Sequence, residues 1–465
     1  MPHPDVRPRP PSSSSAVSIL PGGAAAADDE PISAVYGGRS AMADLESCEL
    51  PSCVGQHHAR LLRLGFLHSF SSPFHWNCLM RGYLRSGLPP AALRLYLLMS
   101  RGGVPPDSYT VPIALKAACH LFAICLGRQL HCVALKRGLE MNEFCESGII
   151  SVYSKAGDFT KARKMFDENP QRKLGSWNAI ISGLAQGGSA AEAVGLFLEL
   201  RKSGLLPDDV TMVSVASACG SLGDLELARQ VHKCVLQARH RRPPPLPAAA
   251  TVMLENSLVD MYGKCGRADL AGAVFSRMRH RDVSSWTAMI AALAVQGRAQ
   301  EVVELFRRML AEGVRPNHVT FVGVLSACAH GGLVEEGMRF FARMAGEFGV
   351  EPAAAHYGCV VDMLGRVGRV EDARKLLDGM PTRANAVILG TLLGACEKHG
   401  GVEVAEWAAA RLAALEPGND GVYVVLSNVY AAEGLWEDVA RLRRFMRAKS
   451  LAKVPAYSVA SVLPL

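Results

Sequence analysis

The side chains best suited to catalysis or metal binding, cysteine and histidine, lack the spacings that such chemistry needs. The 465-residue chain has 13 cysteines and 14 histidines, but it contains no Cys-x-x-Cys pair, and no histidine is followed two residues later by glutamate. Those patterns supply the zinc ligands and the proton-shuttling carboxylate of nucleotide deaminases. A Gly-x4-Gly-Lys-Ser/Thr phosphate loop is also absent. The sequence therefore predicts no enzyme, no metal, no cofactor and no small-molecule substrate.

The recurring cysteines and histidines are better explained by packing. Cys219 and Cys328 share one phase of similar segments, with Cys119 shifted by one residue, and His131 and His232 occupy equivalent places in QLHCVALK and QVHKCVLQ. Equivalent positions in a repeat favour structural roles over catalysis. An odd number of cysteines without paired spacing favours buried thiols in a reducing compartment.

Composition narrows the class of protein further. The chain carries a net charge of +7 with 49% hydrophobic and 20% charged residues, which excludes a mostly disordered protein. Its longest apolar stretches, such as 121–135, are interrupted by Arg128 and His131, so we expect no membrane span. The modest positive charge is compatible with a polyanionic partner.

Internal repeats determine the architecture. Trp76, Trp177 and Trp286 open three similar segments, spaced 101 and then 109 residues apart. Each tryptophan is followed by a Pro-Asp or Pro-Asn dipeptide and then by a segment that ends in Ala-Cys. A turn comes next, with the sequence Ser-Lys-Ala-Gly157, Gly-Lys-Cys-Gly266 or Gly-Arg-Val-Gly368. The period divides into units of about 35, 35 and 31 residues. We expect the three tryptophans to point inward.

Each unit is predicted to form two helices. In 252–282, apolar residues at Leu258, Val259, Met261 and Tyr262 follow helical spacing before Gly263 and Gly266, and a second apolar stripe follows. Units this small bury such stripes only by stacking on neighbours. The prediction is an all-α protein, a right-handed α-solenoid superhelix of helix-turn-helix units with a long groove suited to an extended ligand.

Two segments have biased composition. Residues 1–40 are rich in Pro, Ser and Ala with Arg7 and Arg9, which is compatible with an organellar transit peptide or a disordered tail. Residues 239–250 include a Pro-rich run ending at Pro247, which predicts an exposed insertion because proline cannot continue a helix.

These motifs resemble the plant pentatricopeptide repeat family, in the branch that cycles P, L and S repeats and carries an E extension. The alignment gives P repeats at 73–107, 174–208 and 283–317, L repeats at 108–142, 209–251 and 318–353, and S repeats at 143–173, 252–282 and 354–384. A degenerate repeat falls at 41–72, the E extension at 385–455 and a tail at 456–465. The tetratricopeptide class of peptide-binding scaffolds is the rival solenoid, but its period is constant.

The resemblance implies sequence-specific binding of single-stranded organellar RNA, one base per repeat, read by the fifth and last residues. The family's uracil-type pairs would be Asn77/Asp107, Asn178/Asp208 and Asn256/Asp282, and its adenine-type pair Thr287/Asn317. Weaker positions are Ser147/Lys173 and Pro112/Asn142, while Val213/Thr251 and Val322/Ala353 carry little polar information. Second residues Phe74, Phe144 and Met253 would pack on bases, whereas Gly175 and Ser284 depart from that pattern. The expected target is U-N-N-U-N-U-A followed by two loosely specified bases.

The resemblance also implies a biological role. Arrays with an E extension commonly select cytidines for C-to-U editing of organelle transcripts, and since this chain ends at Leu465 without deaminase motifs we expect a deaminase-domain protein and editing cofactor proteins to act in trans. A splicing or transcript-stability factor is the alternative from the same fold, and a peptide-binding scaffold is the alternative from another class. Family habit favours the mitochondrion over the chloroplast.

Overall fold

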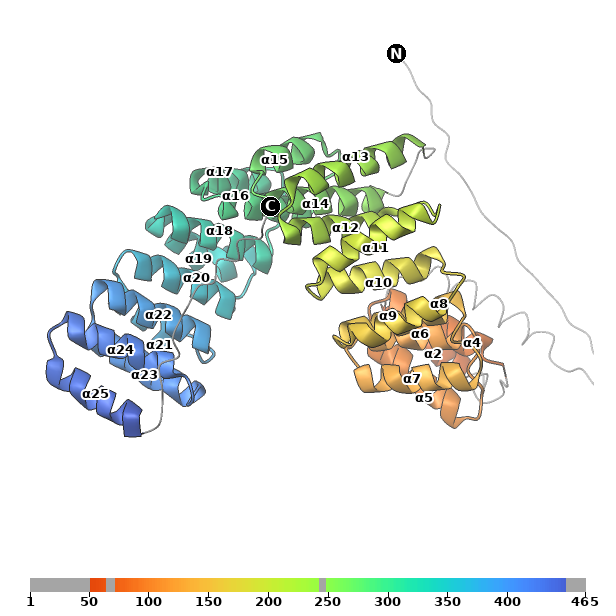
Figure 1. Cartoon of the computed structure of the whole chain (residues 1–465), viewed down its shortest axis with the longest axis horizontal. Helices are drawn as coiled ribbons and strands as arrows, with labels where there is room; N and C mark the ends of the chain where they lie inside the picture. Colours follow the sequence, from red (N-terminus) through yellow and green to blue (C-terminus); the bar gives the residue numbers. More distant parts are fainter. Residues whose placement is uncertain (1–50, 64–71, 242–247, 449–465) are drawn as a thin grey trace, which may run out of the picture. The chain divides into compact units, whose positions relative to one another are not determined.

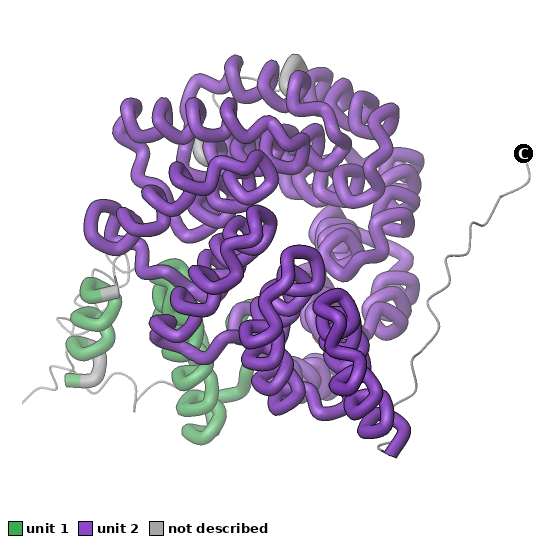
Figure 2. The backbone as a smooth tube through the Cα atoms, turned by 90° about the vertical axis from the view of Figure 1, so that its left-hand side faces the viewer, with its two compact units in different colours: residues 1–117 green, residues 118–465 purple. Residues whose placement is uncertain are grey.

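The protein is described by a computed structural model over residues 51–63, 72–241 and 248–448. The described residues form 23 α-helices and no strand (Figure 1). They divide into two compact units, residues 1–117 and 118–465 (Figure 2), each of which is described here by itself. The predicted transit peptide at 1–40 and the tail at 456–465 lie outside the described residues.

The first unit contains α2 (Pro51–Arg63), α4 (Phe74–Arg85), α5 (Pro89–Arg101) and most of α6 (Thr110–His120). Helices α4 and α5 form a packed pair, and α2 lies against α4. His58 of α2 joins Tyr83 of α4, with 2.8 Å between the imidazole Nδ1 and the phenolic oxygen. This contact fixes α2 to the first complete repeat.

The second unit stacks helix pairs in chain order (Figure 1). Its helices are α7 (Ile124–Lys136), α8 (Glu143–Lys155), α9 (Phe159–Glu168), α10 (Leu174–Gln186), α11 (Ala190–Lys202), α12 (Asp209–Leu222), α13 (Leu225–Arg241), α14 (Ala248–Lys264), α15 (Ala268–Arg277), α16 (Val283–Val295), α17 (Ala299–Ala311), α18 (His318–Gly331), α19 (Val334–Phe348), α20 (Ala354–Arg366), α21 (Val370–Asp378), α22 (Ala386–His399), α23 (Val402–Leu415), α24 (Asp420–Ala432) and α25 (Trp436–Ala448). The first helices of successive pairs, from α8 to α24, pack side by side. The predicted α-solenoid of helix pairs is confirmed.

Aromatic side chains form the core between pairs, as the sequence predicts. Trp76, Trp177 and Trp286 are 6%, 3% and 0% exposed. Trp177 and Trp286 each meet a phenylalanine of the preceding second helix edge to face, with centroid distances of 4.7 Å and 5.0 Å. These contacts join one repeat to the next, so no pair stands alone.

The recurring cysteines and histidines also have structural roles. Cys119, Cys219 and Cys328 are buried, and burial raises the pKa of the Cys219 and Cys328 thiols to about 12. His131 and His232 reach Tyr153 and Tyr262 of the following first helix, at 2.8 Å and 3.0 Å between Nδ1 and the phenolic oxygen. This is the contact that His58 makes with Tyr83 in the other unit.

The Pro-rich insertion differs in its limits from the prediction. Helix α13 continues to Arg241 and α14 begins at Ala248, so only 242–247 separate them, and these six lie outside the described residues. Thr251 therefore lies inside α14, whereas the alignment places it at the end of the preceding repeat. No proline occupies 248–251, and alanine continues a helix readily.

Candidate RNA-binding site

Three predicted pairs of asparagine and aspartate are hydrogen-bonded in the structure. The Asn77 Nδ2 atom donates to Asp107 Oδ1 at 3.0 Å in the first unit. In the second unit, Asn178 Nδ2 lies 3.1 Å from both carboxylate oxygens of Asp208, and Asn256 Nδ2 lies 3.0 Å from Asp282 Oδ1. Residues 26 to 30 positions apart in sequence are thus brought to the same place in three repeats.

The aspartates are held by the start of the next helix. Asp208 is the N-cap of α12, and its Oδ1 accepts the Thr211 backbone N–H at 2.8 Å; Asp282 caps α16 and accepts the Ser285 N–H at 2.9 Å. An N-cap side chain satisfies helix N–H groups that have no intrahelical partner. Capping therefore fixes the positions of Asp208 and Asp282, the last side chains of their repeats.

A buried hydroxyl completes two of these clusters. Thr110 Oγ1 lies 2.8 Å from Asn77 Oδ1 and 2.8 Å from Asp107 Oδ1. Thr211 Oγ1 lies 2.5 Å from Asn178 Oδ1 and 2.8 Å from Asp208 Oδ1. Both threonines are fully buried. Each hydroxyl orients the amide, so that the asparagine presents one N–H and one oxygen lone pair in a fixed direction.

The third cluster lacks the contact between hydroxyl and amide. Ser285 Oγ donates to Asp282 Oδ1 at 3.0 Å, but the buried Asn256 Oδ1 has no hydrogen-bond partner among the described residues. A half-satisfied amide is unfavourable until another donor reaches it. The Asn256 Oδ1 atom is itself buried, so this pair differs from the other two in having an amide oxygen that is neither bonded to a described residue nor open to the surface.

Burial opposes ionisation of Asp107, but hydrogen bonds from Thr110, Tyr109 and Asn77 outweigh it and lower the pKa of the Asp107 carboxyl. The pKa of Asp282 is lowered in the same way, against burial, by Ser285 and Asn256. Both groups are therefore carboxylates at neutral pH, able only to accept hydrogen bonds.

The predicted Thr287/Asn317 pair is connected indirectly. Thr287 Oγ1 lies 2.8 Å from Thr320 Oγ1, and Thr320 Oγ1 lies 3.0 Å from Asn317 Oδ1. Asn317 caps α18 as the aspartates cap their helices. The hydroxyl of Thr320 thus bridges the two residues that the sequence pairs.

The weaker predicted positions have other local bonds. Ser147 Oγ donates to the Phe144 carbonyl oxygen in its own helix, and Lys173 is the N-cap of α10 without a capping side chain. Asn142 caps α8 through bonds from the Phe144 and Cys145 N–H groups. Pro112 is half-buried in α6. No hydrogen bond among the described residues joins Ser147 to Lys173.

The predicted base-packing residues are exposed apolar side chains: Phe74 and Phe144 lie in the first turns of α4 and α8, and Met253 is the sixth residue of α14. Phe74, Phe144 and Met253 are 57%, 62% and 47% exposed. The structure adds residues at the same place in other helix pairs that the sequence analysis did not identify: Tyr109 in the first unit and Val210, Val319 and Val387 in the second, all exposed. These four residues occupy the second position of their repeats, which is the feature that could have identified them. The fifth residues of the L repeats carry little polar information, so those repeats are not expected from the sequence to contact a base.

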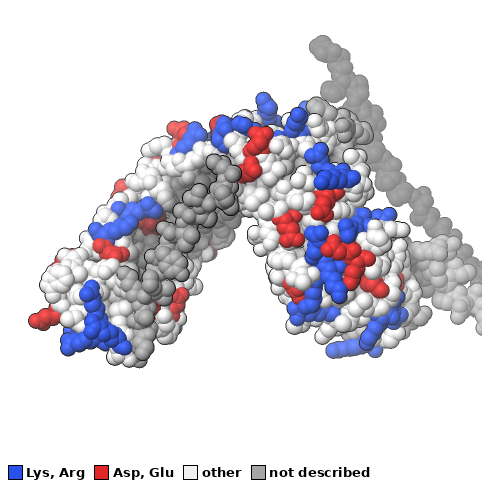
Figure 3. Space-filling model, in the orientation of Figure 1, with Lys and Arg blue, Asp and Glu red and all other residues white. Residues whose placement is uncertain are grey.

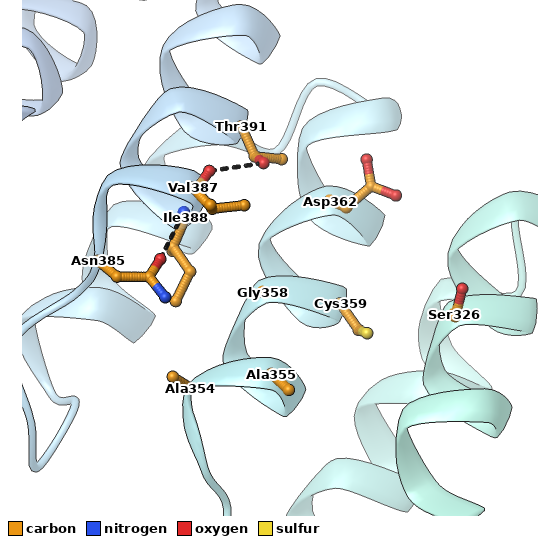
Figure 4. Close-up of a pocket in the computed structure, with 10 residues that line it drawn as sticks. All are labelled: Ser326, Ala354, Ala355, Gly358, Cys359, Asp362, Asn385, Val387, Ile388 and Thr391. Atoms are coloured by element: carbon orange, nitrogen blue, oxygen red, sulfur yellow. Dashed lines mark hydrogen bonds between the residues drawn. The ribbon is translucent and has the colours of Figure 1, made fainter. Parts of the chain in front are cut away.

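A pocket of about 350 Å³ lies between α18, α20 and α22 (Figure 4). Gly358, the fifth residue of the last repeat, stands where other repeats carry asparagine, and Ala355 and Val387 also line it. Asn385 caps α22 through the Ile388 N–H at 3.0 Å, so it corresponds to the capping aspartates, one residue beyond the predicted boundary at 384. No Pro-Asp step marks it in the sequence.

The described residues offer little to a metal ion or a membrane. They include no cluster of three or more His, Cys, Asp or Glu side chains placed to bind a metal. None of the helices that the structure describes combines the length and apolar character of a membrane span.

Family models match most of the chain. The PPR repeat family model matches 72–120 and 281–330, the PPR repeat model matches 147–168, 175–205, 256–283, 319–347 and 355–383, and the E motif model matches 399–460. The two ranges of the PPR repeat family model each span three helices, α4 to α6 and α16 to α18.

Several Arabidopsis thaliana proteins are similar in sequence. Pentatricopeptide repeat-containing protein At1g77170, mitochondrial, is 52% identical over 90% of this chain and 88% of its own length. Protein At2g03880, mitochondrial, is 38% identical over 82% of this chain, and At1g59720, chloroplastic/mitochondrial, is 39% identical over 83%. The chain spans 59% and 62% of these last two relatives.

Solved structures share the fold. The pentatricopeptide repeat protein PPR10 from maize matches with a TM-score of 0.58 and 18% identity, over 90% of this chain and 65% of that one. PPR10 in complex with an 18-nt psaJ RNA element matches with a TM-score of 0.57, over 85% and 62%.

Proposed function

Because the chain belongs to the pentatricopeptide repeat family, we propose that it binds single-stranded RNA, reading one base with the fifth and last residues of each informative repeat. The observation that carries this proposal is the amide–carboxylate pair held at 3.0–3.1 Å in three separate repeats. Asn178 and Asn256 hold their pairs at a partly open surface, which solenoid packing alone does not require, whereas Asn77 is only 4% exposed. The RNA-bound relative in the same fold supports the ligand class.

The chemistry of the pairs suits uracil. Each asparagine Nδ2 uses one hydrogen on the neighbouring aspartate, which leaves the second for a base oxygen. The Asn178 Oδ1 atom, which already accepts from Thr211, keeps a second lone pair that would accept from the N3–H of the base. Thr287, whose hydroxyl is already shared with the Val283 carbonyl and Thr320, offers a smaller polar group and more room, which suits adenine in the third P repeat, 283–317.

Base stacking would come from the exposed second residues. Aromatic or apolar side chains such as Phe144, Val210 and Met253 present a flat or compact surface to the base face. Gly175 and Ser284 offer less contact, and we therefore propose weaker stacking in their repeats. The proposed target remains U-N-N-U-N-U-A.

The E extension would bind the protein that supplies the deaminase activity. Helices α22–α25 form two further pairs, and the E motif model covers 399–460. Figure 3 shows Lys and Arg gathered over α25, where Arg441, Arg443, Arg444 and Arg447 lie, and Trp436 of that helix is 66% exposed. We propose that this region binds a deaminase-domain protein or an editing cofactor protein. The chain itself would be a recognition factor for C-to-U editing and not an enzyme.

We propose the mitochondrion as its compartment, because two of the relatives above are named mitochondrial and a third chloroplastic/mitochondrial. A splicing or transcript-stability role is the alternative that the same RNA-binding surface would allow.

Sequencing of organelle transcripts from plants lacking the protein tests the role. Loss of editing at one or a few cytidines downstream of a U-N-N-U-N-U-A tract would support the proposal. Normal editing together with an unspliced intron or an unstable transcript end would replace it with the alternative. Unchanged transcripts, together with no binding of the purified chain to that RNA, would reject both.

A further inference from the structure

One residue of the second unit holds a backbone conformation that its side chain disfavours. Phe122 has φ of 51° and is the only non-glycine residue with positive φ among the described residues. It lies two residues after α6, the first helix of its L repeat, at the repeat position where the other two L repeats have the C-cap residues Gly223 and Gly332, with φ of 68° and 69°. Glycine is the usual residue there because it has no Cβ to clash.

The phenylalanine ring does little for the fold in return. It is 67% exposed, so burial of the ring does not offset the strain. Residues held in such sparsely populated backbone conformations cluster at functional sites. The ring is therefore better explained by a contact with another molecule.

A cation accompanies the ring. Lys155 Nζ lies 4.7 Å from the Phe122 ring centroid and donates to the Cys119 carbonyl oxygen at 3.1 Å. No carboxylate of the described residues lies within salt-bridge distance of it. The equivalent cations of the other S repeats, Lys264 and Arg366, are paired with Asp260 and Asp362 four residues earlier, where this repeat has Ser151.

The first L and S repeats thus differ from their two counterparts in a correlated way, with an exposed aromatic ring in place of glycine and a cation without a carboxylate. An aromatic face beside a positive charge is the combination that binds single-stranded nucleic acid, because any base stacks on the ring and the cation attracts phosphate.

We propose that Phe122 and Lys155 form an accessory RNA site that stacks one base without reading its identity. Lys155 lies at the C-terminal end of α8, about 12 Å along the helix axis from Ser147, so the site is separate from the base-reading row. The proposal rests on the proposed RNA-binding function and adds a contact outside the fifth-and-last pairs. A protein partner is less well supported, since the uncompensated charge favours a polyanion.

The accessory site is tested by measuring both the RNA affinity and the melting temperature of full-length variants. The probe is a single-stranded RNA containing the U-N-N-U-N-U-A tract, and binding is followed by fluorescence anisotropy. Phe122→Gly should weaken binding by at least about fivefold, from the loss of one stacked base, without lowering the melting temperature, because glycine relieves the strain. Phe122→Tyr should retain binding. Leu121→Ala, which truncates the exposed neighbour, is the matched control and should bind as the parent chain does.

Two further readouts separate stacking from a structural effect. An RNA carrying 2-aminopurine should show quenching at one position with the parent chain and recovery of fluorescence with Phe122→Gly. Lys155→Met should reduce the slope of log affinity against log salt by about 0.7, the value for one single-strand phosphate contact.

Equal affinity and equal quenching for Phe122→Gly and the parent chain would overturn the accessory site, and would point to a protein partner for the ring. Failure of the parent chain to bind the tract would instead reject the RNA-binding function itself, so the two failures are distinguishable.

Discussion

Replacing Thr211 with valine tests whether the buried hydroxyl organises a base-reading pair. The change removes an oxygen that lies 2.5 Å from Asn178 Oδ1 and 2.8 Å from Asp208 Oδ1, and that accepts the Asp208 N–H at 3.3 Å. Valine keeps the branched shape and a similar helix propensity, and the cap from Thr211 N–H to Asp208 remains. Because Thr211 is fully buried, water does not replace the hydroxyl.

The expected loss of stability is about 1–3 kcal/mol, the range for leaving a buried polar partner unsatisfied. Urea unfolding followed by circular dichroism measures it as a lower midpoint. The freed Asn178 amide should also lose its preference for uracil at that repeat, measured by anisotropy with RNAs that differ only at the facing base. Thr211→Ser should restore both properties.

Thr391→Val provides the control. That hydroxyl donates to Val387 O of its own helix at 2.9 Å and holds no neighbouring side chain, so the expected change in stability is within about 0.5 kcal/mol. If Thr211→Val unfolds and discriminates bases as the parent chain does, the hydroxyl does not organise the pair and the reasoning is refuted.

Three other outcomes are expected. Burial lowers the pKa of His131, against the opposite effect of nearby carboxylates. The free energy of unfolding is therefore highest above the unfolded-state pKa of about 6.5, and it falls as the pH drops through the lower folded-state pKa, because the unfolded protein binds the proton more readily. His131→Phe should flatten that part of the pH–stability curve. Gly263→Ala should destabilise the protein by about 1–3 kcal/mol, seen as a lower melting temperature, because the new Cβ would meet the α16 backbone at 3.1 Å. In timed alkylation read by mass spectrometry, exposed Cys125 should react in the folded protein, whereas Cys219, buried and with its pKa raised to about 12, should react only after unfolding.

The repeat pattern is sufficient to predict the solenoid and which asparagine meets which aspartate in the proposed base-reading pairs. Asn178 and Asp208 are far apart in sequence, yet repeat length fixes which residue starts the next helix, and the hydrophobic stripes leave one way to stack the pairs. The inward tryptophans follow from the same pattern, because Trp177 stands next to Asn178 on a helix whose other side is polar or small.

Other parts of the site depend on contacts that repeat alignment does not reveal. Thr110 and Thr211 follow their aspartates by three residues, which is the capping-box spacing, but only packing shows that their hydroxyls also reach asparagine in the preceding repeat. Asn385 has no proline directly before it, and it lies one residue beyond the expected end of its repeat, so the repeat alignment does not identify it as a capping residue. The positive φ of Phe122 arises from the tight helix connection and is not encoded by its own residue type.

Exchanging one pair for another tests the central claim most directly. The double change Asn178→Thr with Asp208→Asn gives the second P repeat the residues that the third carries at Thr287 and Asn317. Affinities for RNAs with each of the four bases facing that repeat should show the preference move from uracil to adenine, with preferences at other positions unchanged. An unchanged preference for uracil, in a variant that folds and binds RNA as tightly as the parent chain, would contradict the account.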